Sequence, residues 1–120
     1  MSQMDNGRLL WAVFRNCEKG NFLSKDSTKR LINKICEKIK MTPLAGPFTG
    51  TIKDNEQPEL NGCSGVLIIK ESHIAVHLWV ETKEASIVIN SCVDFDVKPL
   101  IEFLKEEFFT EDMEIKANVV

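Results

Sequence analysis

The segment HIAVHLWV, residues 73–80, alternates strictly between two classes of side chain. Successive side chains of a β-strand point to opposite faces of a sheet, so this pattern predicts a strand with one apolar face and one mixed face. The apolar face consists of Ile74, Val76, Leu78 and Val80. The mixed face consists of His73, Ala75, His77 and Trp79. The second half of the chain is therefore expected to be built around a half-buried strand.

Neighbouring segments have the same character and are joined to this strand by short polar turns. CSGVLIIK (63–70) precedes it, and EASIVINSC (84–92) follows the turn ETKE. Strands connected by such short turns pair antiparallel. Three further strands are predicted elsewhere in the chain, at 8–17, 48–52 and 113–120.

Two segments show helical periodicity instead. Residues 24–40 place apolar side chains on one stripe of a helix, and residues 97–108 do the same. Pro99 falls in the first turn of the second helix, where proline is tolerated. Pro43 and Pro47 are expected to end the first helix and to open a loop-rich stretch.

The predicted order of elements is β-α-β-β-β-β-α-β, which indicates an α+β fold. Two amphipathic helices suffice to cover one face of an antiparallel sheet, giving a two-layer sandwich. All 120 residues are expected to form a single domain, 1–120. No further helix is available to cover the second face of the sheet. We therefore expect that mixed face to be an interface, a functional site, or both.

Composition narrows the classes of partner. The net charge of −3 and the scattered basic residues argue against a nucleic-acid partner. No apolar run approaches the ~18 residues of a membrane span, and MSQMDNGR at the N-terminus lacks a signal-peptide pattern. The four cysteines have no zinc-site spacing, so free thiols in the cytoplasm are expected.

The turns predict how the strands align. A tight turn around 70–72 places Ser64 beside His77, and a turn at 82–83 places Cys92 beside His73. Ser72 and Cys92 then lie at one end of the sheet, whereas Ser64, His77 and Glu81 lie toward the other.

The two clusters are too far apart to cooperate within one chain. Ser72 and His77 are five residues apart on one strand. At ~3.3 Å per residue this is about 16 Å, against the ~3 Å that proton transfer requires. A two-fold homodimer sets opposite ends of two sheets against each other. It would therefore create two shared active sites.

The block SGVLIIKESHIAVHLWVE, followed by Ser91-Cys92, resembles the short pyruvoyl-dependent S-adenosylmethionine decarboxylases of bacteria and archaea. The family pattern has S-G-V, then E-S-H, then H-T-W-P-E, then T-C-G, and the spacings agree. The specific match covers residues 62–94, and the resemblance in element order covers most of the chain.

The resemblance implies an enzyme that makes its own cofactor. The Ser72 hydroxyl attacks the carbonyl of Glu71, and the chain is then cut into 1–71 and 72–120 with a pyruvoyl group in place of Ser72. In such enzymes the ketone forms a Schiff base with the substrate amine and draws electrons as carbon dioxide leaves. The family needs no metal and no pyridoxal phosphate. Its product is the aminopropyl donor for spermidine synthesis.

Positions in the motif carry over as roles for individual residues. Ser72 becomes the electrophile, His77 is the base that helps processing, and Cys92 is the acid that reprotonates the product carbon. Ser64 supports the processing intermediate, and Glu81 holds the ribose hydroxyls of S-adenosylmethionine. The family's active sites are similarly shared across a homodimer. The implied processing residues are Glu71, Ser72, Ser64 and His77; the catalytic residues are Ser72, His77 and Cys92; the substrate-binding residues are Glu81 and Ser64.

Three positions depart from the family pattern. Leu78 stands where threonine is usual, Val80 where proline is usual, and Val93 where glycine is usual. All three lie beside the expected pocket, so they bear on the choice of substrate. Two alternatives stay open: a pyruvoyl decarboxylase of arginine or ornithine on the same scaffold, and a dimeric relative that is neither processed nor catalytic.

Overall fold

The computed structural model describes residues 6–119 of the chain. Its elements follow the predicted order, with one short 3-10 turn added between the second and third strands. Val120, the last residue of the predicted final strand, lies outside the described residues. The elements are β1 (Arg8–Phe14), α1 (Lys25–Lys38), β2 (Pro43–Ile52), η1 (Pro58–Leu60), β3 (Gly62–Ile69), β4 (Ser72–Trp79), β5 (Glu84–Ser91), α2 (Val97–Phe108) and β6 (Met113–Val119).

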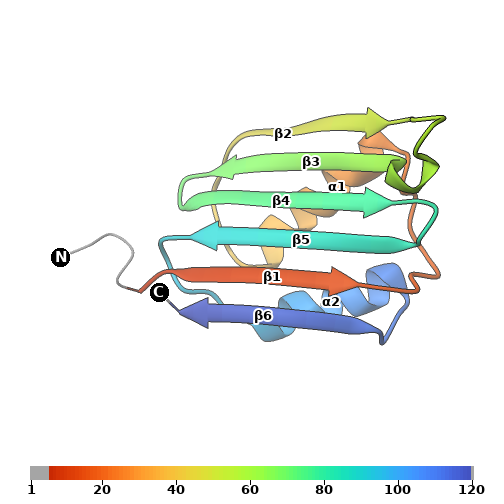
Figure 1. Cartoon of the computed structure of the whole chain (residues 1–120). Helices are drawn as coiled ribbons and strands as arrows, with labels where there is room; N and C mark the ends of the chain where they lie inside the picture. The colour runs from red at the N-terminus through yellow and green to blue at the C-terminus, as the bar shows by residue number, and fades with distance from the viewer. Residues whose placement is uncertain (1–5, 120) are drawn as a thin grey trace.

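The strands form one six-stranded antiparallel sheet in the order β2-β3-β4-β5-β1-β6. Both helices lie on the same side of this sheet, and the opposite side carries no helix (Figure 1). This confirms the predicted α+β two-layer sandwich. None of the helices within residues 6–119 combines the length and apolar character needed to cross a membrane.

The core lies between the sheet and the two helices. Helix α1 is capped by Ser24, whose side chain accepts a hydrogen bond from the amide of Ser27 at 3.1 Å. Its apolar stripe packs against the inner face of the sheet, and α2 contributes a second stripe. The buried side chains of the helices are Thr28, Leu31, Ile32, Ile35, Cys36, Leu100, Leu104 and Phe108.

The prediction that Pro43 and Pro47 lie in a loop is wrong, because β2 begins at Pro43 and contains both prolines. Proline has no N–H to donate, and it is tolerated where a strand has only one hydrogen-bonded neighbour. β2 is such an edge strand. Its register against β3 shifts between Pro43 and Ala45 and again between Ala45 and Phe48. The predicted first strand, 8–17, is also too long, because β1 ends at Phe14.

One predicted register is confirmed and the other is wrong by two residues. Ser64 pairs with His77 as expected. His73, however, pairs with Asn90 rather than with Cys92. The connection between β4 and β5 has four residues, 80–83, instead of two, and it ends with Lys83 in a left-handed conformation (φ 55°). Because a slip of two residues preserves the alternation of faces, every side chain still points to its predicted side.

Glycine at position 62 is required where β3 meets β4. A Cβ atom there would lie 1.7 Å from the carbonyl oxygen of Leu78, so Gly62→Ala must push the two strands apart. We expect a loss of ~1–3 kcal/mol in the free energy of unfolding, the usual cost of overpacking. Urea denaturation measures it.

Gly50→Ala is the matched control, since no atom lies within 4 Å of the Cβ position at Gly50. Its unfolding free energy should stay within about 0.5 kcal/mol of the original chain. Equal effects of the two substitutions would contradict this account of Gly62.

Candidate active site

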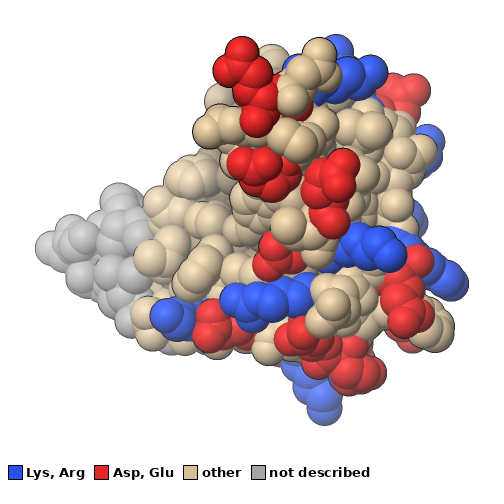
Figure 2. Space-filling model, turned by 45° about the vertical axis from the view of Figure 1, so that its right-hand side comes forward, with Lys and Arg blue, Asp and Glu red and all other residues tan. Residues whose placement is uncertain are grey.

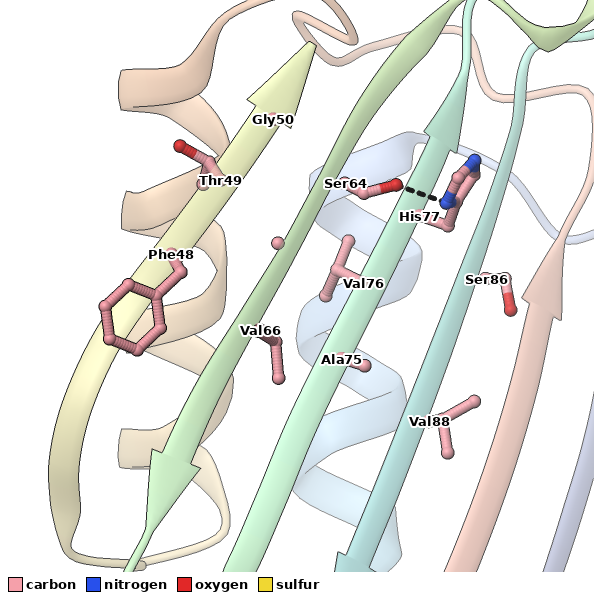
Figure 3. Close-up of a pocket in the computed structure, with 11 residues that line it drawn as sticks. Phe48, Thr49, Gly50, Ser64, Val66, Ala75, Val76, His77, Ser86 and Val88 are labelled. Atoms are coloured by element: carbon pink, nitrogen blue, oxygen red, sulfur yellow. Dashed lines mark hydrogen bonds between the residues drawn. The ribbon is translucent and has the colours of Figure 1, made fainter. Parts of the chain in front are cut away.

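The uncovered face of the sheet carries a shallow hollow over four of its six strands, β2 to β5 (Figure 3). The hollow has a volume of ≈ 410 Å³. Phe48 stands at one side with 55% of its surface exposed, and Ser64 and His77 stand at another. The remaining lining is small or apolar: Thr49, Gly50, Gly65, Val66, Ala75, Val76, Ser86 and Val88.

His77 is held by contacts on two sides. Its Nδ1 atom is hydrogen-bonded to the Ser64 hydroxyl of β3, and its other ring nitrogen points away from Ser64 (Figure 3). The Trp79 ring lies 4.3 Å from the imidazole, between ring centres, tilted by 43°. Burial disfavours the charged imidazolium and lowers the pKa of His77 below its ordinary value of 6.5. A neutral imidazole at neutral pH is suited to accept a proton.

A second hydroxyl beside His77 was missed in the sequence. Ser86 of β5 pairs directly with His77, and Trp11 Nε1 donates a hydrogen bond to Ser86 Oγ at 3.2 Å. The predicted register had set Val88 at this position. Ser86 lies opposite His77 because the β4–β5 turn has four residues instead of two. The sequence ETKE does not by itself distinguish a four-residue turn from a two-residue turn.

Ser72 lies at the other end of the sheet, where the β3–β4 hairpin returns. Only Lys70 and Glu71 form the turn, because Ile69 already pairs with Ser72. The φ angle of Ser72 is 153°, a value that L-residues rarely adopt. The other non-glycine residues with positive φ lie in the ordinary left-handed region, between 48° and 57°. The hairpin therefore concentrates backbone strain at the Glu71–Ser72 junction.

Both oxygen-bearing groups of Glu71 are hydrogen-bonded. Its carboxylate accepts from the amide of Thr42 at 3.1 Å, which ties the hairpin to the start of β2. Its main-chain carbonyl accepts from the amide of Cys92 at 2.9 Å. Cys92 thus approaches the hairpin through its backbone, one position beyond the last paired residue of β5.

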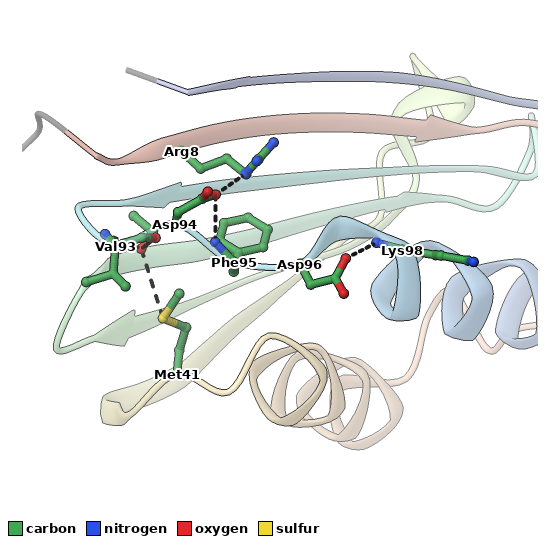
Figure 4. Close-up of polar contacts among 8 residues, drawn as sticks. Arg8, Met41, Val93, Asp94, Phe95, Asp96 and Lys98 are labelled. Carbon is green, nitrogen blue, oxygen red and sulfur yellow. Dashed lines mark hydrogen bonds and ion pairs between the residues drawn. The ribbon is translucent and has the colours of Figure 1, made fainter.

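The segment that follows Cys92 is fixed by hydrogen bonds within the segment and by one from Arg8 of β1 (Figure 4). The Ser91 hydroxyl donates to the carbonyl of Val93 at 2.6 Å and accepts from its amide at 3.0 Å. Asp94 accepts from Arg8 Nε at 2.5 Å, and this hydrogen bond lowers the pKa of the Asp94 carboxyl. Asp96 then caps α2. The position of Cys92 is therefore fixed by its own amide hydrogen bond to Glu71 and by the hydrogen bonds of the residues that follow it.

Cys92 is the half-buried one among the four cysteines, whereas the other three are buried. Burial raises the pKa of Cys17 to about 11, with a smaller contribution from Glu84, and burial also raises the pKa of Cys36. Within the described structure, Cys92 is therefore the cysteine whose thiol is accessible to a ligand.

The predicted site residues fall into the two separate groups that the sequence indicated. Ser72 and Cys92 are at the hairpin end, and Ser64 and His77 are toward the opposite end. Glu81 lies in the exposed β4–β5 turn beyond His77. Within residues 6–119, no group of three or more His, Cys, Asp or Glu side chains is placed to hold a metal ion.

The chain matches known proteins over nearly its whole length. The sequence model of the S-adenosylmethionine decarboxylase family matches residues 9–118. The chain belongs to the S-adenosylmethionine decarboxylase family.

Individual members of the family agree with this match. An S-adenosylmethionine decarboxylase proenzyme of Clostridium botulinum (strain Loch Maree / Type A3) is 34% identical over 100 residues, which is 80% of each chain. A proenzyme of the same name from Methanococcus maripaludis is 39% identical over 64 residues, covering 49% of this chain and 52% of its own. The predicted family is confirmed, and it is a family of enzymes.

A solved structure confirms the fold independently. The crystal structure of the adenosylmethionine decarboxylase from Aquifex aeolicus superposes with a TM-score of 0.73, covering 96% of this chain and 90% of that one. The two sequences are only 14% identical over this alignment, so the likeness is one of fold.

On the side of the molecule in Figure 2, acidic and basic side chains are interspersed without a continuous basic area.

The lowered pKa of His77 predicts how stability depends on pH. The unfolded chain, with an ordinary histidine, binds a proton at higher pH than folded His77 does. As the pH falls through about 6.5, protonation therefore favours the unfolded chain and the free energy of unfolding decreases. Urea denaturation at pH 7.5 and 5.5 measures this decrease in a Ser72→Ala chain, which lacks the hydroxyl to which the family resemblance assigns self-cleavage.

His77→Gln in the same Ser72→Ala background is the control. It removes the imidazole and should make the loss between the two pH values smaller, while effects of carboxylates remain in both chains. An identical loss in both would contradict the assigned pKa direction.

Proposed function

We propose that this chain is a self-processing decarboxylase of S-adenosylmethionine, and that its product serves as the aminopropyl donor for spermidine synthesis in the cytoplasm. Family membership supports the substrate, since the relatives are named S-adenosylmethionine decarboxylase proenzymes. The observation that carries self-processing is local: a strained Ser72 follows a carbonyl that is held by the Cys92 amide.

The geometry around the Glu71–Ser72 bond suits attack on that carbonyl. Strain of the kind shown by Ser72 costs about 1–3 kcal/mol and persists only where surrounding structure enforces it. Breaking the bond would release this strain. The Cys92 N–H, 2.9 Å from the Glu71 oxygen, would stabilise the negative charge that develops there during attack. The residues present therefore fit a pyruvoyl group generated at Ser72.

Processing then consists of three steps on the protein's own backbone. Ser72 Oγ bonds to the Glu71 carbonyl carbon and the amide C–N bond breaks, so the peptide becomes an ester. Loss of the Ser72 Cα proton then expels the Glu71 carboxylate and separates 1–71 from 72–120. Water finally replaces the nitrogen of the dehydrated residue as ammonia leaves. The resulting pyruvoyl carbonyl would supply an electron-withdrawing group during decarboxylation.

We infer that His77 takes part as a base and that Ser64 sets its tautomer. If Nδ1 donates to the Ser64 hydroxyl, the other ring nitrogen is free to accept a proton. Ser72 and His77 are about 16 Å apart along β4, so His77 cannot reach its own chain's Ser72. It would instead serve Ser72 of a second copy.

A homodimer through the open face of the sheet fits this requirement. Large apolar side chains stand exposed on that face, on three different strands. Several large apolar side chains exposed on one face are typical of an interaction surface. The exposed residues are Leu9 (44%), Trp11 (39%), Phe48 (55%) and Ile68 (42%).

Substrate contacts are assigned to the same face and its edges. Cys92 would reprotonate the carbon that loses carbon dioxide, and Glu81 would bind the ribose hydroxyls. Phe14 is fully buried in the core, whereas Phe48 lines the hollow and is exposed. Of these two phenylalanines, Phe48 is the one available to stack on an adenine ring.

The decisive experiment asks whether the purified chain cuts itself and what it decarboxylates. Denaturing mass spectrometry should show two fragments, 1–71 and 72–120, the second with a pyruvoyl terminus. Carbon dioxide should be released from S-adenosylmethionine and not from arginine or ornithine. Ser72→Ala is the control and should remain intact, folded and inactive. A wild-type chain that stays whole with an unmodified serine would overturn the proposal.

A substitution of Cys92 distinguishes self-cleavage of the chain from catalytic turnover. Cys92→Ala keeps the backbone N–H that contacts Glu71, so cleavage should proceed, but it removes the thiol. We expect kcat to fall on the order of 100-fold, as for loss of a general acid. Cys17→Ala, which removes a buried thiol to which no role is assigned, is the control and should retain activity. Full activity of Cys92→Ala would exclude the thiol as the proton donor.

A further inference from the structure

His73 contacts the reacting serine directly. Its Nδ1 atom lies 3.3 Å from Ser72 Oγ. The chain contains two histidines, and the other, His77, is about 16 Å away along the same strand. Within one subunit, His73 is thus the imidazole that can accept a proton from Ser72. The motif implies no role for His73.

The contact depends on the unusual backbone of Ser72. Adjacent side chains in a regular strand point to opposite faces of the sheet and do not meet. Ser72 and His73 are adjacent, yet their side chains touch, because Ser72 departs from the extended conformation with a φ of 153°. The same distortion that strains the Glu71–Ser72 bond therefore turns the hydroxyl toward a base.

A base is chemically required at this point. A serine hydroxyl is a weak nucleophile until an adjacent group removes its proton. The Cys92 amide already polarises the carbonyl to be attacked, at 2.9 Å from the Glu71 oxygen. His73 completes the pair: one group activates the nucleophile, and the other activates the electrophile.

We propose that His73 is the general base for the first step of cleavage and that it acts on Ser72 of its own subunit. His73 Nδ1 takes the Oγ proton as Oγ bonds to the Glu71 carbonyl carbon. It returns the proton to the Ser72 nitrogen as the C–N bond breaks, so no other reactant is consumed. The Cα proton is lost later, to His77 of the partner subunit. This inference rests on the self-processing proposed above.

Processing should stop at different stages in variants of the two histidines. His73→Asn keeps a side chain able to accept a hydrogen bond but unable to take a proton. Its cleavage should be slower on the order of 100-fold, with no ester accumulating. His77→Ala should instead accumulate the ester. Hydroxylamine cuts an ester at Ser72 and leaves an amide intact, so it should release fragments from His77→Ala and not from His73→Asn.

Asn90→Ala is the matched control for position 73, because Asn90 pairs with His73 across the sheet. It changes the neighbourhood of the imidazole without removing it, and cleavage should proceed at the wild-type rate. His73→Gln gives a second substitution should His73→Asn not fold, as judged by circular dichroism. Cleavage of a folded His73 variant at the wild-type rate would overturn the inference.

Mixed dimers test in which subunit each histidine acts. When His73→Asn and His77→Ala chains are co-expressed, the His77→Ala chain retains its own His73 and faces an intact His77 of the partner subunit. It alone should be cut, and mass spectrometry identifies it. Cleavage of the His73→Asn chain instead, or of neither chain, would overturn this division of roles. An uncut wild-type chain would separately defeat the proposed function.

Discussion

The antiparallel pairing of β3, β4 and β5 is the constraint on which the rest of the structure depends. It fixes which side chains share the uncovered face, because a slip of one residue would move every one of them into the core. It also sets their neighbours, since Ser64 and Ser86 reach His77 only in the observed registers. The hollow and the contacts of the imidazole follow from these hydrogen-bonded ladders.

The hairpin between β3 and β4 holds Ser72 in a backbone conformation that L-residues rarely adopt. A glycine would adopt the φ of Ser72 without strain, yet the position carries a hydroxyl. Departures of this kind are expected where function overrides stability. Hydrogen bonds from Thr42 and Cys92 to Glu71 hold the strained junction from two neighbouring segments. Strain, a polarised carbonyl and a nearby imidazole thus meet at one peptide bond.

The length of β4 explains why one subunit holds only half of the proposed site. Ser72 begins the strand and His77 follows five residues later, so the two groups cannot meet within the chain. The apolar side chains exposed on the same face provide a surface through which a second copy can supply the missing half. In the proposed arrangement, the chemistry of the first step would stay within a subunit and that of the second step would cross the interface.

The sequence by itself determined the elements, their order and the face of each strand residue, because side-chain periodicity is a local property of the backbone. Its motif also singled out Ser72, His77 and Cys92. Only the tertiary structure decided the four-residue turn that sets Ser86 beside His77, the edge strand containing Pro43, and the contact between Ser72 and His73. These features depend on turn geometry and on hydrogen bonds between distant segments, which periodicity does not encode.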